Sequence, residues 1–229
     1  MKLTHHLDDA TLVRYAAGDL DEAFTVIVAS HIAMCPQCQK ASHNAEELGG
    51  QLLEAAEEVA VEQDAFAKLM GAIDDQNKAN FDGVDAQNVH PFPKRRAKIA
   101  GDVPLPLQRF LGTQVADIEW KKVAPGISKH DIVLDKDVPS SLYLLNIAEG
   151  QAVPEHGHGG MEMTLILSGA YNDRFGRFGP GDIADLDEHV EHQPIVEPGG
   201  GPCICLVATE KPTKFKGIIE RLLQPIIGI

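Results

Sequence analysis

The sequence has no run of eighteen apolar residues, the length that a membrane-spanning helix needs. Its first residues, MKLTHHLDDATL, also lack the apolar core of a signal peptide. We therefore expect no membrane partner and a cytoplasmic location. Familiar catalytic signatures are missing too, because no Ser/His/Asp order, phosphate-binding loop or dinucleotide fingerprint stands in a recognisable context.

Positive charge is scarce. The 229 residues include 20 Lys and Arg against 34 Asp and Glu, for a formal net charge of −14. Residues 1–89 hold 5 of the basic and 16 of the acidic side chains, giving −11. Such a field disfavours nucleic acid and anionic membranes. It suits a basic protein partner, although acidity that only maintains solubility is the alternative.

Cysteine is also scarce, and its four copies fall in two close pairs, Cys35/Cys38 and Cys203/Cys205. In a cytosolic chain such spacing favours metal binding or packing over disulfides. Cys203 and Cys205 share one face of a predicted strand, so core packing is the preferred interpretation. A redox or metal-supporting role is the alternative.

The first pair belongs to the motif His31-x3-Cys35-x2-Cys38. On a helix, His31 and Cys35 lie one turn apart on one face, and Pro36 favours a turn that brings Cys38 back. The His pair His5/His6 could supply a fourth ligand. A His2Cys2 set closes the tetrahedral shell of zinc and is typical of a structural site. A core histidine is the alternative for His31.

Apolar spacing predicts about four helices in the first third of the chain: Asp8 or Asp9 to about Ala17, Asp21 to Cys35, 38–60 and Asp64 to about Ile73. The fourth has an apolar side that could pack in a core or stay free for a partner. Turn formers and the cluster PFPKRR follow. We therefore expect a helical domain at 1–75, a linker at 76–104 and a second domain at 105–229.

The second domain has short strand-like runs punctuated by glycine and proline, at 115–120, 142–147, 161–167, 183–186 and 204–207. This spacing is typical of an all-β sandwich or barrel. The fold class is thus a multidomain α + β chain. The last fifteen residues, 215–229, could form a short helix or a closing strand.

A second metal constellation lies among these strands. His156, His158 and Glu162 have one parity, so on an unbroken strand they face the same side. A fourth ligand could be His189 or His192, and His192 is preferred because it opens the next strand. Three His and one Glu suit Zn, Fe, Mn, Ni or Cu. Such a site could perform metal chemistry, hold a regulatory ligand or only stabilise the barrel. The alternative to a metal site is that His156 and His158 are exposed residues of a loop.

The motif from His31 to Cys38, with its upstream His, resembles the zinc-binding anti-sigma domain. The segment Gly150 to Gly169, followed by Gly179-Pro180-Gly181-Asp182, resembles the two motifs of the cupin barrel. Both in this order, with the opening HHLDDATLVRYAAGDLDEAF, resemble the ChrR family of anti-sigma factors. The resemblance implies zinc ligands at His6, His31, Cys35 and Cys38, and ligands for a second divalent metal at His156, His158, Glu162 and His192. His192 departs from the usual cupin motif, because it lies well beyond the Pro-Gly-Asp turn.

The resemblance implies a helical zinc domain of about four helices that sequesters a group IV (extracytoplasmic-function) sigma factor. It further implies a cupin domain required for release of that factor under oxidative stress from singlet oxygen or organic hydroperoxides. One alternative is a cupin-type metal dioxygenase or isomerase with a regulatory zinc domain. Another alternative is an interaction module in which both metals only stabilise the fold.

Overall fold

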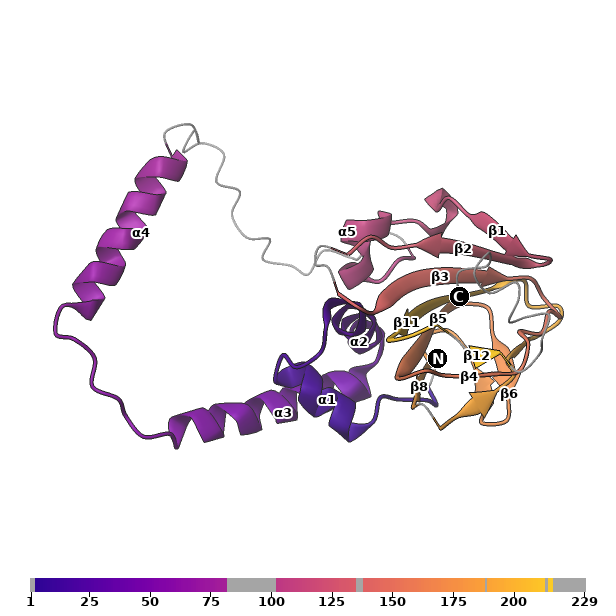
Figure 1. Ribbon diagram of the computed structural model, residues 1–229, viewed down its shortest axis with the longest axis horizontal. Coiled ribbons are helices and arrows are strands. Elements are labelled where there is room, and N and C mark those ends of the chain that lie inside the picture. The colour runs from indigo at the N-terminus through magenta and orange to yellow at the C-terminus, as the bar shows by residue number, and fades with distance from the viewer. Residues whose placement is uncertain (1–2, 82–101, 135–137, 188, 213, 216–229) are drawn as a thin grey trace. The chain divides into compact units, whose positions relative to one another are not determined.

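The computed structural model describes residues 3–81, 102–134, 138–187, 189–212 and 214–215 (Figure 1). The chain divides into two compact units, one formed by residues 1–50 with 100–229 and the other by residues 51–99. None of the helices in the described ranges combines the length and apolar character needed to cross a membrane.

Three helices open the chain: α1 (Asp9–Ala16), α2 (Glu22–Met34) and α3 (Pro36–Glu54). The side chain of Asp8 caps α1 by accepting from Thr11 N, and Asp21 caps α2 by accepting from Phe24 N. Cys35 leaves the helical conformation with φ −116° and ψ 102°, because the proline that follows excludes it from the helix. The chain therefore turns between α2 and α3 at this cysteine.

The fourth helix, α4 (Ala65–Phe81), lies in the second unit and runs beyond the expected end near Ile73. The third, α3, ends at Glu54 instead of near residue 60. Four large apolar side chains of α4 are 40–75% exposed: Phe66, Leu69, Met70 and Ile73. Apolar contacts within the described part of the chain therefore do not cover this face.

A six-stranded antiparallel sheet dominates the first unit. Its spatial order is β1 (Lys121–Ala124), β2 (Ile127–Asp131), β3 (Ser141–Ile147), β11 (Cys203–Thr209), β5 (Glu162–Ser168) and β8 (Ile183–Leu186). Two three-stranded sheets complete the β structure, β10 (Ile195–Val196), β6 (Tyr171–Asp173) and β7 (Gly176–Phe178) in one, and β12 (Lys214–Phe215), β4 (His156–Gly157) and β9 (Glu191–His192) in the other. Short helical turns precede the sheets at η2 (Leu105–Leu107), α5 (Gln108–Leu111) and η3 (Val115–Asp117).

The strands predicted at 142–147, 161–167, 183–186 and 204–207 are confirmed by β3, β5, β8 and β11. The strand predicted at 115–120 is wrong, because Val115–Asp117 forms a 3-10 turn and residues 118–120 join no sheet. Of the final segment, Lys214–Phe215 forms a short strand, and residues 216–229 lie outside the described residues. The cluster PFPKRR also lies outside them.

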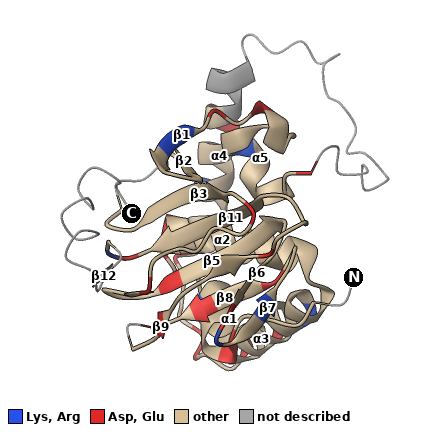
Figure 2. Cartoon of the chain, turned by 90° about the vertical axis from the view of Figure 1, so that its right-hand side faces the viewer, with Lys and Arg blue, Asp and Glu red and all other residues tan. Residues whose placement is uncertain are grey.

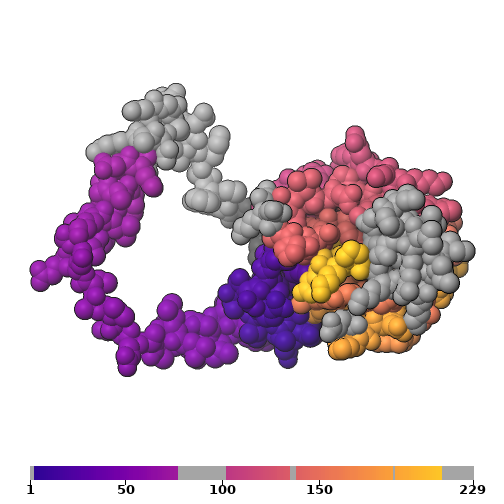
Figure 3. Space-filling model, in the orientation of Figure 1, coloured from indigo at the N-terminus to yellow at the C-terminus, as the bar shows by residue number. Residues whose placement is uncertain are grey.

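The central strands of the large sheet, β3, β11 and β5, are buried on both faces. On β3, Leu142 and Leu144 belong to an apolar cluster that includes Ile27 of α2, whereas Tyr143 and Leu145 belong to a second cluster facing the smaller sheets. Helix α2 therefore covers the outer face of the sheet, and the N-terminal helices pack directly on the β structure (Figure 3). Burial on two faces explains why these strands are continuously apolar instead of alternating.

Polar contacts also join the helices to the β structure. The Thr11 hydroxyl donates to Asp185 at 2.8 Å, and the Ser140 hydroxyl donates to the carboxylate of Asp21. A further ion pair, between Arg109 of the short helix α5 and Glu22 of α2 at 2.8 Å, joins two helices of this unit. Residues 1–50 are thus packed as part of the β unit, rather than as a free-standing helical domain.

Candidate metal centres

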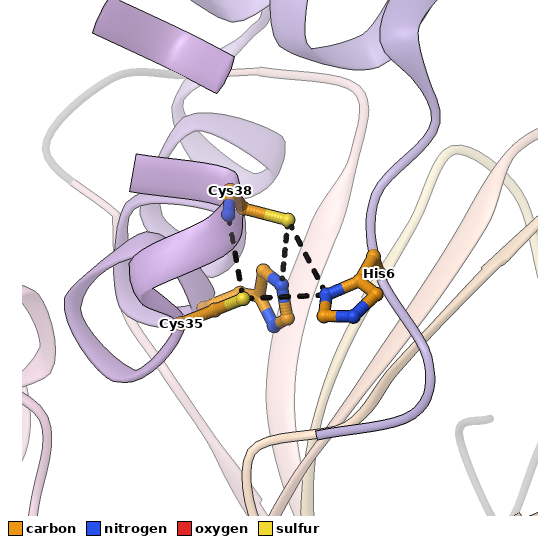
Figure 4. A group of neighbouring side chains, drawn as sticks. His6, Cys35 and Cys38 are labelled. Atoms are coloured by element: carbon orange, nitrogen blue, oxygen red, sulfur yellow. Dashed lines mark hydrogen bonds between the residues drawn. The ribbon is translucent and has the colours of Figure 1, made fainter. Parts of the chain in front are cut away.

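The first centre, which we call the His/Cys centre, gathers His6, His31, Cys35 and Cys38. One ligand atom from each lies within 4.8 Å of all the others. The segment before α1 supplies His6, α2 supplies His31, Cys35 lies at the C-terminal cap of α2, and Cys38 lies in the first turn of α3. Figure 4 shows His6, Cys35 and Cys38 pointing toward one another.

The spacing of these atoms fits a tetrahedral metal. Zinc bonds of about 2.3 Å to sulfur and 2.0–2.1 Å to nitrogen place the two atom types about 3.5 Å apart. Sγ of Cys35 lies 3.3 Å from Nδ1 of His6, and Sγ of Cys38 lies 3.7 Å from the same atom. Nε2 of His31 is 3.2 Å from Sγ of Cys38. The His/Cys centre could therefore hold a metal without rearrangement of its backbone.

The other histidine of the N-terminal pair points elsewhere. The ring of His5 stacks on Phe178 with centroids 3.8 Å apart. His6 is thus the histidine that the structure places in the cluster. Sequence spacing alone could not choose between His5 and His6, because it does not determine the direction in which side chains of an irregular segment point.

Burial sets the protonation of the His/Cys centre. It lowers the pKa of His31 to about 4, although the hydrogen bond to the Gly181 carbonyl opposes this shift. It raises the pKa of Cys38 to about 11, and the neighbouring Cys35 adds to that rise. At neutral pH His31 is therefore a neutral imidazole, the form that binds metal, and Cys38 must lose its proton when metal binds.

The second centre, which we call the barrel centre, gathers His156, His158, Glu162 and His192, all buried. Their ligand atoms also lie within 4.8 Å of one another. The expected single strand does not exist: β4 ends at Gly157, and β5 begins at Glu162. The ligands converge because β4 pairs with β9, which sets His156 opposite His192.

Two histidines of the barrel centre are oriented by outer contacts. Nδ1 of His156 donates to the Pro154 carbonyl at 2.8 Å, and Nδ1 of His192 donates to Asp173 at 3.0 Å. Their Nε2 atoms then meet at 3.1 Å, close to the 3.0–3.4 Å that metal–nitrogen bonds of about 2.1 Å produce. This arrangement, with one ring nitrogen held and the other turned inward, is typical of metal-binding histidine.

Burial and neighbouring side chains shift the pKa values of two residues at the barrel centre. Burial lowers the pKa of His156 to about 4. Burial raises the pKa of Glu162, but the neighbouring imidazoles, His158 first, outweigh it and leave the pKa below its usual value. Nδ1 of His158 lies 3.1 Å from Glu162, yet neither ring nitrogen makes an aligned hydrogen bond within the described residues. A cation would satisfy these buried atoms.

The alternative fourth ligand, His189, is exposed and belongs to neither cluster. A cavity of about 50 Å³ adjoins the barrel centre and is lined in part by Tyr143, Tyr171 and Cys205. Cys203 and Cys205 are 0% and 3% exposed in the inner core, consistent with packing.

Three groups that hold the ligand histidines were not predicted from the sequence: Asp173, the Pro154 carbonyl and the Gly181 carbonyl. Asp173 lies 19 residues from His192, and Gly181 lies 150 residues from His31. No local spacing rule connects residues at such separations, so only the fold could reveal Asp173 and Gly181, whereas the Pro154 carbonyl lies two residues from His156.

Together, the fold and the two clusters define a two-part protein in which a helical His/Cys module is joined to a cupin barrel. Residues 108–211 match the family model described as the ChrR cupin-like domain. The chain is 37% identical to the anti-sigma-E factor ChrR of Cereibacter sphaeroides over 229 residues, which is the whole of both chains. The chain therefore belongs to the ChrR family of anti-sigma factors.

One solved structure covers nearly the whole chain. The crystal structure of Rhodobacter sphaeroides SigE in complex with the anti-sigma ChrR matches with a TM-score of 0.70 and 35% identity, over 91% of this chain and 99% of that chain. The structure of KdgF from Halomonas sp. matches only 42% of this chain and 91% of that chain, at 19% identity and a TM-score of 0.35. Membership of a family of regulators replaces the alternative of a cupin-type enzyme.

Proposed function

We propose that this chain is a cytoplasmic, zinc-dependent anti-sigma factor. It sequesters a group IV sigma factor and releases it when the cupin domain responds to oxidants such as singlet oxygen or organic hydroperoxides. The observation that carries the proposal is the full-length similarity to the anti-sigma-E factor ChrR. A relative of this kind has been solved bound to SigE.

The helical region suits such a partner. A sigma factor binds nucleic acid and therefore presents basic surfaces, and the formal charge of −11 over residues 1–89 complements them. In the barrel unit, Figure 2 shows further acidic positions around β8 and β9, although Asp185 of β8 is engaged by Thr11 of α1. The exposed apolar face of α4 offers the buried contacts that a stable complex needs.

Zinc is the metal that best suits the His/Cys centre, because two thiolates and two imidazoles close a tetrahedral shell. That centre then ties the segment before α1 to the turn between α2 and α3. The barrel centre has only nitrogen and oxygen ligands and accommodates several divalent metals. Its burial beside a cavity suits a sensory role, and a purely structural role is the second possibility.

The first test is co-expression of the full chain with a group IV sigma factor encoded beside it, followed by size-exclusion chromatography and zinc analysis. We expect one complex with zinc at the His/Cys centre. Cys35→Ser should lose that zinc and the sigma factor, whereas the buried Cys203→Ser, which lies outside the centre, should keep both. A Cys35→Ser chain that still binds the sigma factor tightly would refute zinc dependence.

The second test addresses the response. The purified complex is exposed to singlet oxygen from a photosensitiser or to an organic hydroperoxide, and free sigma factor is measured. We expect Glu162→Gln to bind the sigma factor normally but to release less of it on exposure. Equal release from the wild-type and variant complexes would instead favour the structural role of the barrel centre.

A further inference from the structure

The turn between β7 and β8, residues Gly179–Asp182, contacts both segments that bring histidine ligands to the His/Cys centre. The Gly181 carbonyl accepts from Nδ1 of His31 at 2.9 Å. The Asp182 carboxylate accepts from the backbone N–H groups of Thr4 and His5 at 2.7 and 3.0 Å, directly before His6. We propose that this cupin turn is a positioning element of the His/Cys centre and slows its loss of metal.

The contact at Gly181 orients one ligand. Because a carbonyl oxygen only accepts, His31 carries its proton on Nδ1 and leaves Nε2 free, and Nε2 is the atom that faces the sulfur of Cys38 at 3.2 Å. Both His31 and its partner are buried, so water does not compete for this hydrogen bond. The turn thereby selects the tautomer that binds metal.

The contact at Asp182 orients the other histidine. Its Oδ1 atom receives the two N–H groups of the N-terminal segment, while Oδ2 receives the N–H of Gly179 and closes the turn. Burial raises the pKa of Asp182, but these three N–H donors outweigh it and leave the pKa below its usual value. The residue is therefore a carboxylate with both oxygens engaged, a role that one amide cannot fill.

The turn itself is fixed by packing. A Cβ added at Gly181 would lie 2.6 Å from Cδ2 of Leu3, so the N-terminal segment lies directly on the glycine. Phe178, the last residue before the turn, stacks on His5 on one side and on Tyr171 on the other, with centroids 3.8 and 4.9 Å apart. Tyr171 lines the cavity beside the barrel centre. The positioning contacts thus belong to the cupin domain and not to the helices.

This inference rests on the proposed function, because it assumes a metal at the His/Cys centre. Cobalt(II) is the probe, since cobalt–thiolate absorption reports only the centre that contains cysteine. The full chain is loaded with cobalt, and the decay of this absorption is followed after addition of excess EDTA. The same spectra record the ligand geometry, which a merely stabilising contact would leave unchanged.

We expect Asp182→Asn to lose cobalt about tenfold faster or more and to shift the thiolate spectrum, as loss of an outer partner typically weakens metal sites. Thr4→Pro, at an exposed position, removes one of the N–H donors together with the Thr4 hydroxyl, which lies 3.4 Å from both Asp182 oxygens, and should give a smaller change of the same kind. Asp102→Asn is the matched control, because Asp102 accepts one backbone N–H, from Val115, outside both centres.

Release rates in Asp182→Asn and Thr4→Pro within twofold of the wild-type rate would overturn the proposal. If Asp182→Asn fails to fold, the rate of cobalt release from Thr4→Pro alone tests the proposal. A wild-type chain without cobalt–thiolate absorption would refute the metal centre itself, and with it this inference. That failure is distinguishable, because unchanged rates in a chain that does bind cobalt leave the proposed function intact.

Discussion

Asp173 accepts a hydrogen bond from Nδ1 of His192 at 3.0 Å, and the two side chains are 0% and 2% exposed. The carboxylate holds the imidazole ring so that Nε2 faces the other ligands of the barrel centre. We predict that Asp173→Asn weakens metal binding at this centre by about 10–100-fold, the usual effect of losing such a partner. The measurement is metal content after dialysis against graded chelator concentrations.

The control for this prediction is Glu197→Gln. Glu197 also belongs to an ion pair, with Arg177 at 2.8 Å, but that pair is partly exposed and contributes little. An Asp173→Asn chain that keeps its metal as tightly as Glu197→Gln would show that Asp173 does not orient His192.

Sequence reasoning could predict all eight residues of the two clusters, but by different routes. Spacing suggested His31, Cys35 and Cys38, since a helix and a proline turn have known geometry. The choice of His6 over His5 came from resemblance. The parity argument for His156 and Glu162 assumed one strand, whereas pairing of β4 with β9 is what brings the barrel ligands together. Long-range pairing has no local signature.

At the scale of the element, helix α2 carries the packing between the helices and the sheet. Ile27 is 0% exposed and shares an apolar cluster with residues of β3, β5 and β11. We predict that Ile27→Ala lowers the free energy of unfolding by about 2–5 kcal/mol, because it removes buried methyl groups and leaves a cavity. Denaturant unfolding of the full chain measures the loss.

Val13→Ala on α1 is the control, since Val13 is 54% exposed and should change the unfolding free energy by less than about 0.5 kcal/mol. A loss for Ile27→Ala as small as that of Val13→Ala would mean that α2 does not pack on the sheet in solution.

Asp185 of β8 faces the same interface. Burial raises its pKa, and although the Thr11 hydroxyl lowers it again, the net shift is upward. A raised carboxyl pKa means that the folded state favours the protonated form, so Asp185 contributes less stability as pH rises through its folded pKa. Asp185→Asn keeps an acceptor for Thr11 and removes the buried charge.

We therefore predict that Asp185→Asn raises the melting temperature at pH 7 and that its advantage shrinks as the pH falls through the raised pKa of Asp185, because the folded wild-type protein takes up a proton there. Thermal unfolding monitored by circular dichroism across this pH range measures it. Asp64→Asn, at an exposed position, should show no such trend. A lower melting temperature for Asp185→Asn at pH 7 would mean that the charge itself supports the interface.

Element prediction succeeded where burial was strong. The long strands β3, β5 and β11 are apolar on both faces and stood out in the sequence. Strands β1 and β2 were missed because Lys121–Asp131 is largely polar, with a turn at Gly126 (φ 73°). The two-residue strands β4, β9, β10 and β12 are too short to show any period.

For the whole molecule, the division into units places residues 1–50 with the β structure and residues 51–99 apart. The four N-terminal helices expected from the sequence are present, but three of them begin in the unit that contains the barrel. A boundary near residue 75 followed from turn-forming residues, and such residues also occur inside α4. Composition alone therefore did not reveal which helices belong to the same unit as the barrel.

Helix α4 provides the last prediction, which concerns partner binding by the full chain. Phe66 and Leu69 are 75% and 58% exposed, so folding gains little from them. If the proposed sigma factor covers this face, these side chains become buried apolar contacts. We predict that the double change Phe66→Asp and Leu69→Asp weakens the complex at least tenfold, which corresponds to about 1.4 kcal/mol.

The melting temperature of the free double variant should stay at the wild-type value, because exposed substitutions rarely change stability. Val133→Asp on the barrel unit, where Val133 is 85% exposed, adds one negative charge outside α4 and should leave binding unchanged. Surface plasmon resonance at two salt concentrations separates the effects, since salt screens the interaction of the added carboxylates with the partner but does not restore the lost apolar contact. Wild-type affinity for the double variant would place the sigma-binding surface elsewhere on the chain.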